Sequence, residues 1–323
     1  MKALVCRAIS EDISTVRVED LPVREPGPGE VRLRIRAASV NFPDILMIQG
    51  KYQHKPPLPF TPGMEGAGEV VAVGEGVTRF RAGDRVVGGL RTGGFAEEAV
   101  AAESALRAIP KGMDFSAAAA FPAAYLTAYV ALVRRAAIET GETLLVHGAA
   151  GGVGLAAVDL GLAFGARVIA TASSEEKRAF LAARGAHLVL PSTGFREAVK
   201  DFTGGLGADV IYDPVGGDVF DESVRCIAFD GRLLVIGFTS GRIPEISVNM
   251  PLIKGFSVVG VRAGEYGRRF PARGRENLEA IDQLAEEGII RPHVFATFPL
   301  ERAVEAMRML QERKVIGKVV VTP

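Results

Sequence analysis

The stretch TLLVHGAAGGVGLAAVDLGLAFGA, residues 143–166, joins an apolar run, a glycine-rich turn and a second run rich in alanine and leucine. This order predicts a buried strand, a tight turn and a helix, which is the context that dinucleotide binding requires. Against the pattern G-x-G-x-x-G, Ala149 replaces the first glycine, Gly151 lets the backbone approach a pyrophosphate, and Gly154 lets helix and strand pack closely. The alternative is a glycine-rich turn that binds no ligand.

Backbone N–H groups at the start of this helix are predicted to face the pyrophosphate, because the helix dipole favours negative charge there. The residues concerned are Ala150, Gly151, Gly152 and Val153.

The surrounding sequence alternates between apolar strand-like runs and helical runs. Strands are expected at 143–148, 167–171, 188–190, 209–212, 232–236 and 257–261, and helices at 153–164, 175–184, 195–202 and 218–229. Continuous apolar strands separated by helices indicate a parallel sheet that is covered on both faces. Six such strands make a complete doubly wound (Rossmann) domain.

The remaining sequence has a different character. Residues 1–120 are β-rich and punctuated by glycine and proline, with strands expected at 31–37, 66–74 and 84–88. Residues 115–133 are rich in alanine and predict a helix with a break at Pro122. After the six-strand domain, helices are expected at 276–287 and 301–313, and strands at 294–298 and 318–321.

We therefore predict an α/β chain in which the tail returns to the N-terminal part. The first domain comprises 1–120 plus 266–323, and the nucleotide-binding domain, 121–265, is inserted into it.

Composition excludes several classes of function. Apolar residues make up 48% and charged residues 24% of the 323 residues, which excludes a disordered chain. Acidic and basic residues balance at 38 each, so no net field favours nucleic acid or an acidic membrane surface. No secretory signal or membrane-spanning stretch is visible, and a cytoplasmic location is expected. Cys6 and Cys226 are interpreted as buried small apolar residues.

The second strand of the series distinguishes the two nicotinamide cofactors. NAD sites usually place an acidic residue about 20 residues after the glycines, whereas Ala172 or Ser173 stands here. Without that carboxylate, a 2′-phosphate is not repelled. Ser173 and Ser174 can donate hydrogen bonds, while Lys177 and Arg178 can supply positive charge. These residues predict NADP(H) rather than NAD(H), although Lys177 and Arg178 can also form a merely solvated helix face.

Ligands of doubly wound sheets lie outside the carboxyl ends of the strands. We therefore expect six residues at the ends of the fifth and sixth strands near the nicotinamide: Val235, Ile236, Gly237, Phe238, Val261 and Arg262. Gly217 is also predicted to bind the cofactor.

The chain resembles the zinc-independent quinone oxidoreductases, the zeta-crystallin branch of the medium-chain dehydrogenase/reductase superfamily. The resemblance covers nearly the whole sequence. It is carried by the segments at 40–52 (VNFPDILMIQGKY), 58–74 (LPFTPGMEGAGEVVAVG), 83–87 (GDRVV), 141–154 (GETLLVHGAAGGVG) and 317–320 (GKVV). The family commonly has Gln where this chain has Asp159. The resemblance implies a GroES-like catalytic domain with an inserted Rossmann domain, and a homodimer that is often paired through the edge of the Rossmann sheet.

The resemblance also places Asn41, Tyr52 and Thr127 around the nicotinamide and the substrate. Asn41 could bond the carboxamide or a substrate carbonyl, or simply cap a turn before Pro43. Tyr52 could donate a proton or hydrogen bond to a developing oxyanion, or pack in a loop. Thr127 lies on an expected helix, where its hydroxyl could instead bond a backbone carbonyl. Glu65 is interpreted as structural.

Zinc-dependent relatives carry a Cys ligand and a His ligand where this chain has Asn41 and Met64, so no metal is expected. We therefore predict an NADPH-dependent oxidoreductase that delivers hydride to quinones or related conjugated carbonyls. The segment from Asn41 to Tyr52 also resembles the 2-enoyl thioester reductases, which makes reduction of an enal or enoyl C=C bond the alternative. A crystallin-like structural or RNA-binding protein that binds NADPH is the alternative of another class, disfavoured by the balanced charge.

Overall fold

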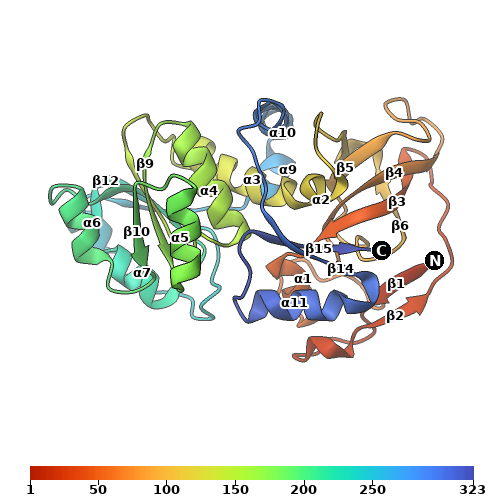
Figure 1. The fold of residues 1–323 in the computed structure, drawn as a ribbon, viewed down its shortest axis with the longest axis horizontal. Helices are drawn as coiled ribbons and strands as arrows, with labels where there is room; N and C mark the ends of the chain where they lie inside the picture. Colours follow the sequence, from red (N-terminus) through yellow and green to blue (C-terminus); the bar gives the residue numbers. More distant parts are fainter. The chain divides into compact units, whose positions relative to one another are not determined.

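The structure, a computed structural model, describes all residues from 1 to 323 and divides the chain into two compact units. Unit 1 comprises 1–123 and 291–323, and unit 2 comprises 124–290. Both chain termini therefore lie in unit 1 (Figure 1).

Unit 2 is built on a six-stranded sheet in the order β10-β9-β8-β11-β12-β13. Its strands are β8 (Thr143–Val146), β9 (Arg167–Ala172), β10 (Leu188–Pro191), β11 (Ala208–Asp213), β12 (Ile227–Val235) and β13 (Ser257–Gly260). Every neighbouring pair is parallel. The order reverses between β8 and β11, which is the switch point at which doubly wound sheets bind their ligands. The predicted Rossmann domain is confirmed.

Helices lie between successive strands of this sheet, and two more, α9 and α10, follow its last strand. They are α4 (Gly152–Ala163), α5 (Glu175–Ala183), α6 (Arg196–Phe202), α7 (Gly217–Ser223), α8 (Asn249–Lys254), α9 (Ala263–Arg269) and α10 (Pro271–Glu286). Figure 1 shows α4 and α5 lying along the sheet strands, and α4 packs on β8 and β9. Leu145, Ile169, Ile211 and Leu233 of the central strands share one core with Phe195 and Val199 at α6 and Phe220 of α7.

The helix expected at 218–229 is shorter than predicted, because α7 ends at Ser223. Ile227 already belongs to β12, where it pairs with Ala208 of β11. Residues 224–228, four of which are apolar, therefore read as a continuation of the helix although the chain has turned into a strand. Sheet pairing decides this boundary, since short apolar runs suit either structure.

Unit 1 is formed by a mixed sheet in the order β14-β15-β3-β4-β5-β7, with β6 also paired to β3. These strands are β3 (Glu30–Ser39), β4 (Glu65–Val73), β5 (Arg85–Gly89), β6 (Glu98–Ala102), β7 (Leu106–Ala108), β14 (Val294–Pro299) and β15 (Lys318–Thr322). A separate hairpin pairs β1 (Lys2–Val5) with β2 (Arg17–Asp20). The helices are α1 (Phe42–Ile48), α2 (Phe115–Ala120) and α11 (Ala303–Gln311).

The C-terminal tail adds the last two strands, β14 and β15, at one end of the sheet of unit 1. β15 pairs with β3 through Val320 opposite Ser39, and β14 pairs in parallel with β15. Figure 1 shows α11 beside these two strands, on which it packs. The tail therefore returns to the N-terminal part of the chain. Its return places Lys318, the first residue of β15, next to the end of β3.

The division between the units differs from the expected one at its second crossing. The helix expected at 276–287 falls within the predicted catalytic domain, whereas α10 lies in unit 2. The reason is a pair of hydrogen bonds between residues that are far apart in the sequence. Arg134 donates to Asn277 Oδ1 and to Glu276 Oε2, both at 2.8 Å. α10 also packs on α9.

The Ala-rich segment breaks at the predicted proline, since α2 ends at Ala120 and α3 (Pro122–Tyr129) begins at Pro122. Cys6 and Cys226 are both buried and free, as expected. None of the helices combines the length and the apolar character that crossing a bilayer requires.

Candidate functional site

The glycine-rich turn links β8 to α4 at the centre of the unit 2 sheet. Gly148 adopts a positive φ of 54°, and Ala149 N donates to Thr171 O of β9 at 3.0 Å. Gly151 is the N-cap of α4 and provides no side-chain cap, and no acidic residue lies in the first turn. The first N–H groups of α4 are therefore left for an anionic ligand.

Gly154 lies where α4 crosses the turn most closely. A Cβ atom at this position would stand 2.4 Å from Gly148 O and 2.8 Å from Ala149 Cα, both backbone atoms. A Cβ atom at Gly151 would meet only Gly148 O, at 3.3 Å. The two glycines therefore serve different purposes: Gly154 permits the close packing of turn and helix, and Gly151 keeps the outer face of the turn open.

The end of β9 carries the residues predicted to recognise a 2′-phosphate. Ser173 is exposed, and Ser174 caps α5 by accepting a hydrogen bond from Lys177 N at 3.3 Å. Arg178 donates to Ala172 O at 3.3 Å and to Glu175 Oε2 at 2.6 Å, so its guanidinium lies over the end of β9. No carboxylate follows directly on β9, because the first acidic residue, Glu175, already belongs to α5.

On the other side of the switch point, β11 ends at Asp213. Its buried carboxylate accepts hydrogen bonds from Val215 N at 2.8 Å and Gly216 N at 2.9 Å. Burial raises the pKa of Asp213, against the lowering effect of these two N–H donors. Gly217 has a φ of 58°, and a Cβ atom there would lie 2.7 Å from Ser240 Oγ. Asp213 was not predicted, since its role in the turn depends on the backbone conformation.

The remaining predicted cofactor residues follow β12 and β13. Ile236 N donates to Asp213 O at 2.9 Å, and Val261 N donates to Val235 O at 3.0 Å, which extends the sheet by one residue on each strand. Phe238 is 38% exposed, and Arg262 is the N-cap of α9. All predicted cofactor residues therefore lie at the carboxyl edge of one parallel sheet. Their contact with a cofactor stays a prediction.

His147 ends β8 immediately before the turn and is fully buried. Ser223 Oγ donates to Val219 O at 2.6 Å, so it accepts from His147 Nε2 at 2.8 Å, and His147 Nδ1 accepts from Thr171 Oγ1 at 3.0 Å. These contacts define a neutral imidazole, and burial lowers the pKa of His147 to about 3. No role was predicted for this residue. In the structure, the hydrogen bonds of His147 connect the end of β8 to β9 and to α7.

His147 should make the protein less stable in acid. Its folded pKa lies below the unfolded value of 6.5, so its contribution to stability is present above pH 6.5 and is lost as pH falls. Between pH 7.5 and pH 5.5 we expect wild type to lose about 1.4 kcal/mol more than a His147→Gln variant. Urea unfolding at both pH values measures this difference. Equal losses in the two proteins would contradict the assignment of a neutral buried imidazole.

Thr127 lies on α3, half-buried, in unit 2. The helix continues directly into a π-helical segment, Val130–Arg135, whose C-cap residue Ala136 donates its N–H to Ala131 O at 2.8 Å. Segments of this kind often occur at functional sites, because the extra residue per turn shifts the side chains that follow. Arg134 and Arg135 of this segment bond to α10 and to Gly260 O at the end of β13.

Asn41 of unit 1 stands at the junction of β3 and α1 and is part of a buried polar network. Its Oδ1 accepts from Lys318 Nζ at 2.6 Å, and its Nδ2 donates to Glu65 Oε1 at 2.8 Å. Lys318 Nζ also lies 3.1 Å from Glu65 Oε1. The Lys318 and Glu65 side chains are 8% and 2% exposed. Removing an ion pair from water is costly unless further hydrogen bonds satisfy it, and the Asn41 amide supplies two such bonds here.

Asp44, in the first turn of α1, lies beside this network and is fully buried. Its carboxylate accepts from Asn41 N at 2.8 Å and Gly63 N at 3.0 Å. Burial raises the pKa of Asp44 to about 7, against the lowering effect of these N–H donors and of Lys318. Neither Asp44 nor Lys318 was predicted from the sequence. The one available signal was a lysine opening the apolar strand KVVV.

Tyr52 is half-buried in unit 1, where its ring packs against the apolar core. This is the loop-packing position expected as the alternative to a proton donor. The two interpretations are compatible, because a packed ring holds its hydroxyl in a defined place. The role of Tyr52 in catalysis stays a prediction.

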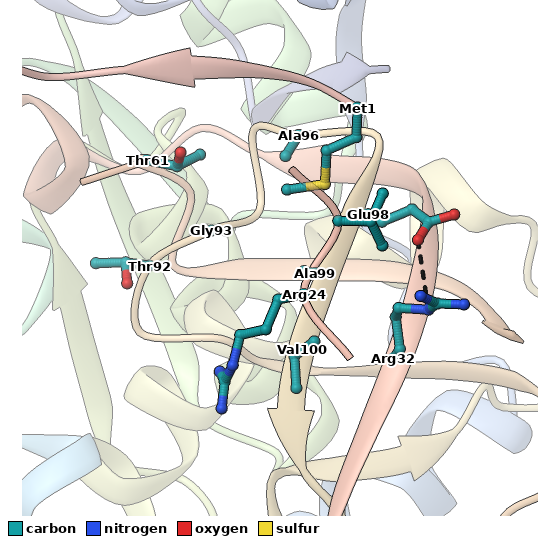
Figure 2. Close-up of a pocket in the computed structure, with 11 residues that line it drawn as sticks. Met1, Arg24, Arg32, Thr61, Thr92, Gly93, Ala96, Glu98, Ala99 and Val100 are labelled. Atoms are coloured by element: carbon teal, nitrogen blue, oxygen red, sulfur yellow. Dashed lines mark ion pairs between the residues drawn. The ribbon is translucent and has the colours of Figure 1, made fainter. Parts of the chain in front are cut away.

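The cavity drawn in Figure 2 is separate from these residues. It has a volume of about 220 Å³ and lies in unit 1, against β6 and the extended segment that contains Arg24. Arg32 Nε and Glu98 Oε2 form an ion pair at 3.5 Å on its wall. None of the predicted catalytic or cofactor residues lines this cavity.

Each of the two units matches a family model of known proteins. Residues 27–111 match the family model described as alcohol dehydrogenase GroES-like domain, and residues 152–282 match the model described as zinc-binding dehydrogenase. The chain is 40% identical over 326 residues to the quinone oxidoreductase-like protein 2 homolog of Nematostella vectensis, covering 99% of this chain and 88% of that protein.

Two solved structures are similar over nearly their full length. Escherichia coli quinone oxidoreductase complexed with NADPH is 28% identical, with a TM-score of 0.91 and complete coverage of both chains. The CurK enoyl reductase is 29% identical, with a TM-score of 0.90 and 99% of each chain covered.

A GroES-like unit that carries an inserted Rossmann unit defines a class of oxidoreductases, and this protein is one of them. The chain belongs to the quinone oxidoreductase-like branch of the medium-chain dehydrogenase/reductase superfamily, the branch that lacks the zinc ligands.

The residues present do not fit a zinc centre, although one matched family model is named for zinc. No group of three or more His, Cys, Asp or Glu side chains is arranged to hold a metal ion. The carboxylate of Glu65 is already neutralised by the Lys318 ammonium.

Proposed function

We propose that this protein is an NADPH-dependent reductase that delivers hydride to a quinone or a related conjugated carbonyl. The observation that carries the proposal is the carboxyl edge of the unit 2 sheet, where the uncapped start of α4 lies beside a β9 end without a carboxylate. The first feature suits a pyrophosphate and the second suits a 2′-phosphate. The NADPH complex of the similar Escherichia coli quinone oxidoreductase supports this choice of cofactor.

The class of acceptor follows from the groups available to the reaction. Asn41, Tyr52 and Thr127 are the proposed catalytic residues, and they offer amide and hydroxyl groups but no Lewis acid. Hydride transfer then requires an acceptor whose developing negative charge spreads into its own conjugated system. A quinone meets this requirement, because its reduced oxygen delocalises into a ring.

A C=C reductase is the second candidate, favoured by the similarity to the CurK enoyl reductase. An assay with NADPH separates the two candidates: 1,4-benzoquinone and a naphthoquinone are compared with crotonyl and acryloyl thioesters. We expect the quinones to be turned over faster than the thioesters. Thioester turnover far above quinone turnover would assign the protein to the second candidate.

Ser173→Asp tests the cofactor assignment directly. The new carboxylate would face the 2′-phosphate, and like charges repel. We expect NADPH affinity to fall at least about tenfold, or about 1.4 kcal/mol, with little change for NADH. Dissociation constants from nucleotide fluorescence measure both effects, and Ser173→Asn is the neutral control of similar size. Tighter binding of NADH than NADPH by wild type would refute the assignment.

Tyr52→Phe removes the proposed proton donor and keeps the ring in the core. General acids typically contribute about 100-fold or more, so we expect kcat to fall by about that factor. The NADPH dissociation constant should stay within about twofold, because the predicted nucleotide turn lies in the other unit. Stopped-flow oxidation of NADPH gives kcat and binding separately. A Tyr52→Phe enzyme with wild-type kcat would leave Tyr52 only its packing role.

We also propose that the protein forms a homodimer through β13. This strand is at one edge of the unit 2 sheet, and its free edge can pair with a second copy. Large apolar side chains stand exposed on and before it: Val248 at 87%, Leu252 at 82%, Ile253 at 72% and Val258 at 39%. Three of them belong to α8 and its N-cap and one to β13, and an exposed apolar group beside a free sheet edge is typical of an interface.

Two glutamates on this surface should separate the subunits. We expect Leu252→Glu with Val258→Glu to elute as a monomer when light scattering shows twice the chain mass for wild type. Leu206→Glu, at a leucine that is 78% exposed outside this segment, serves as the control and should remain dimeric. A wild-type protein that light scattering shows to be a monomer would contradict the proposed dimer.

A further inference from the structure

Thr171, the next-to-last residue of β9, is bonded twice to the glycine-rich turn of unit 2. Regular pairing of β8 with β9 ends at Val146, which lies opposite Ala170. Beyond this pair, Thr171 O accepts from Ala149 N at 3.0 Å, and Thr171 Oγ1 donates to His147 Nδ1 at 3.0 Å. Thr171 therefore fixes the turn against β9 through both its backbone and its side chain.

The hydrogen bonds around His147 all run in one direction. Thr171 Oγ1 donates to Nδ1, Nε2 donates to Ser223 Oγ at 2.8 Å, and Ser223 Oγ donates to Val219 O at 2.6 Å. The three side chains are fully buried, so water does not compete for these bonds. The ring of Phe195 lies beside the imidazole, with the ring centroids 4.7 Å apart, and offers it no polar group. The imidazole thus accepts from β9 and donates to α7.

The residues predicted to bind the 2′-phosphate follow Thr171 directly. Ala172 ends β9, and its carbonyl accepts from Arg178 at 3.3 Å. Ser173 comes next and is exposed, and Ser174 is the N-cap of α5. A shift of Thr171 would therefore move this whole group of residues relative to the turn.

One NADPH molecule has to meet the turn and the end of β9 at the same time. Its pyrophosphate is predicted to bind at the turn and its 2′-phosphate at the end of β9, and the ribose that joins the two groups allows little variation in their distance. The 2′-phosphate contributes its full binding energy only when the two places are already spaced to match. NADH has no 2′-phosphate and is free of this requirement.

We infer that Thr171 and His147 are positioning residues that fix the spacing between the glycine-rich turn and the end of β9, and that this spacing sets the preference for NADPH over NADH. The inference rests on the proposed function. Neither side chain touches the ligand, because both are fully buried. Thr171 acts through the residues that follow it in β9, and His147 acts through Thr171.

Thr171→Val tests the inference, because it removes the hydroxyl and keeps the size of the side chain. The readout is the ratio of the dissociation constants of NADH and NADPH, measured by fluorescence titration without substrate. This ratio should fall by about fivefold, the equivalent of one hydrogen bond. Thr171→Ser keeps the hydroxyl and should retain the wild-type ratio. Affinity for adenosine 2′-monophosphate, measured by competition with NADPH, should stay within about twofold, because a ligand that binds at one place needs no spacing.

Ser223→Ala is the matched control. It removes the other hydrogen bond of His147, so it should destabilise the fold to a similar extent, but it leaves Thr171 bonded to the imidazole. The turn before α7 is held separately, since Asp213 accepts from Gly216 N at 2.9 Å. The ratio should therefore keep its wild-type value. A merely structural role for these bonds would weaken both nucleotides equally in both variants.

A second variant guards against a Thr171→Val protein that fails to fold. Thr171→Val combined with His147→Leu removes both polar partners, so no imidazole nitrogen is left without a bond. Ser223 keeps its own hydrogen bond to Val219 O. The ratio for this double variant should fall as far as that for Thr171→Val.

The outcomes are distinct. A wild-type ratio in the double variant, or an equal fall in Ser223→Ala, overturns the inference and leaves the proposed function intact. Weaker binding of adenosine 2′-monophosphate also overturns it, because the end of β9 itself would then be deformed. Failure of wild type to bind NADPH, or its tighter binding of NADH, overturns the proposed function and the inference with it. A ratio that falls without the Thr171 hydroxyl and is kept in Thr171→Ser and Ser223→Ala establishes the positioning role.

Discussion

Gly154→Ala is expected to weaken the binding of NADPH by about 100-fold. The added Cβ atom would stand 2.4 Å from Gly148 O and 2.8 Å from Ala149 Cα, and neither backbone atom can move without opening the turn. Overpacking of this kind destabilises a protein by about 1–3 kcal/mol. If the displaced turn misplaces the N–H groups at the start of α4, a loss of about 3 kcal/mol in binding corresponds to about a 100-fold weaker complex. Isothermal titration with NADPH measures the loss.

Gly151→Ala is the matched control for this prediction. Its Cβ atom would meet only Gly148 O, at 3.3 Å, so the free energy of unfolding should stay close to the wild-type value. NADPH affinity should still fall, because the methyl group stands where the pyrophosphate approaches. The two variants separate the effect of packing from that of ligand contact. Gly154→Ala should lower both the free energy of unfolding and the affinity for NADPH, whereas Gly151→Ala should lower the affinity alone. Wild-type affinity in Gly154→Ala would refute the assignment of this turn to the nucleotide.

Lys318→Met is expected to destabilise the fold more than any other single substitution proposed for this protein. The change leaves the Glu65 carboxylate, 2% exposed, without its charge partner. Removing one member of a buried ion pair typically destabilises a protein by about 3–5 kcal/mol. Urea unfolding followed by circular dichroism at pH 7.5 gives the change in the free energy of unfolding.

The double variant, Glu65→Gln with Lys318→Met, shows where that loss comes from. It removes both charges, so most of the loss should be recovered even though the ion pair is gone. A double variant as unstable as Lys318→Met would mean that packing of the lysine stem, rather than the unpaired carboxylate, sets the effect. Lys314→Met, at a lysine whose side chain is 65% exposed, should change stability by less than about 0.5 kcal/mol.

The nucleotide-binding unit could be predicted from the sequence in most respects. Its signals are local: an apolar strand, a glycine turn and a helix follow one another within residues 143–166. The six strands are recognisable because each is a short apolar run, although the edge strands β10 and β13 are only partly buried. The helix expected at 218–229 extends too far, since sheet pairing claims Ile227 for β12. The assignment of α10 to unit 2 depends on Arg134, which lies 142 residues before Glu276 in the chain.

The polar network around Asn41 was not predictable in the same way. Asn41 could be singled out by resemblance, and Glu65 was interpreted as structural. Lys318 gave no comparable signal, because it lies 277 residues from Asn41 and nothing in the local sequence connects the two. The alternatives for Asn41, a ligand contact or a turn cap, stayed open for the same reason.

By itself, the sequence determined the strand-turn-helix at residues 143–166, the parallel sheet around it and the absence of a carboxylate after β9. These features follow from hydrophobic periodicity and residue type, which act over a few turns or one strand. Only the tertiary structure decided which charged groups meet in the core of unit 1 and which way the Asn41 amide faces. Antiparallel pairing of β3 with β4 and β15 brings those groups within hydrogen-bonding distance, and the direction of an amide depends on its neighbours in space.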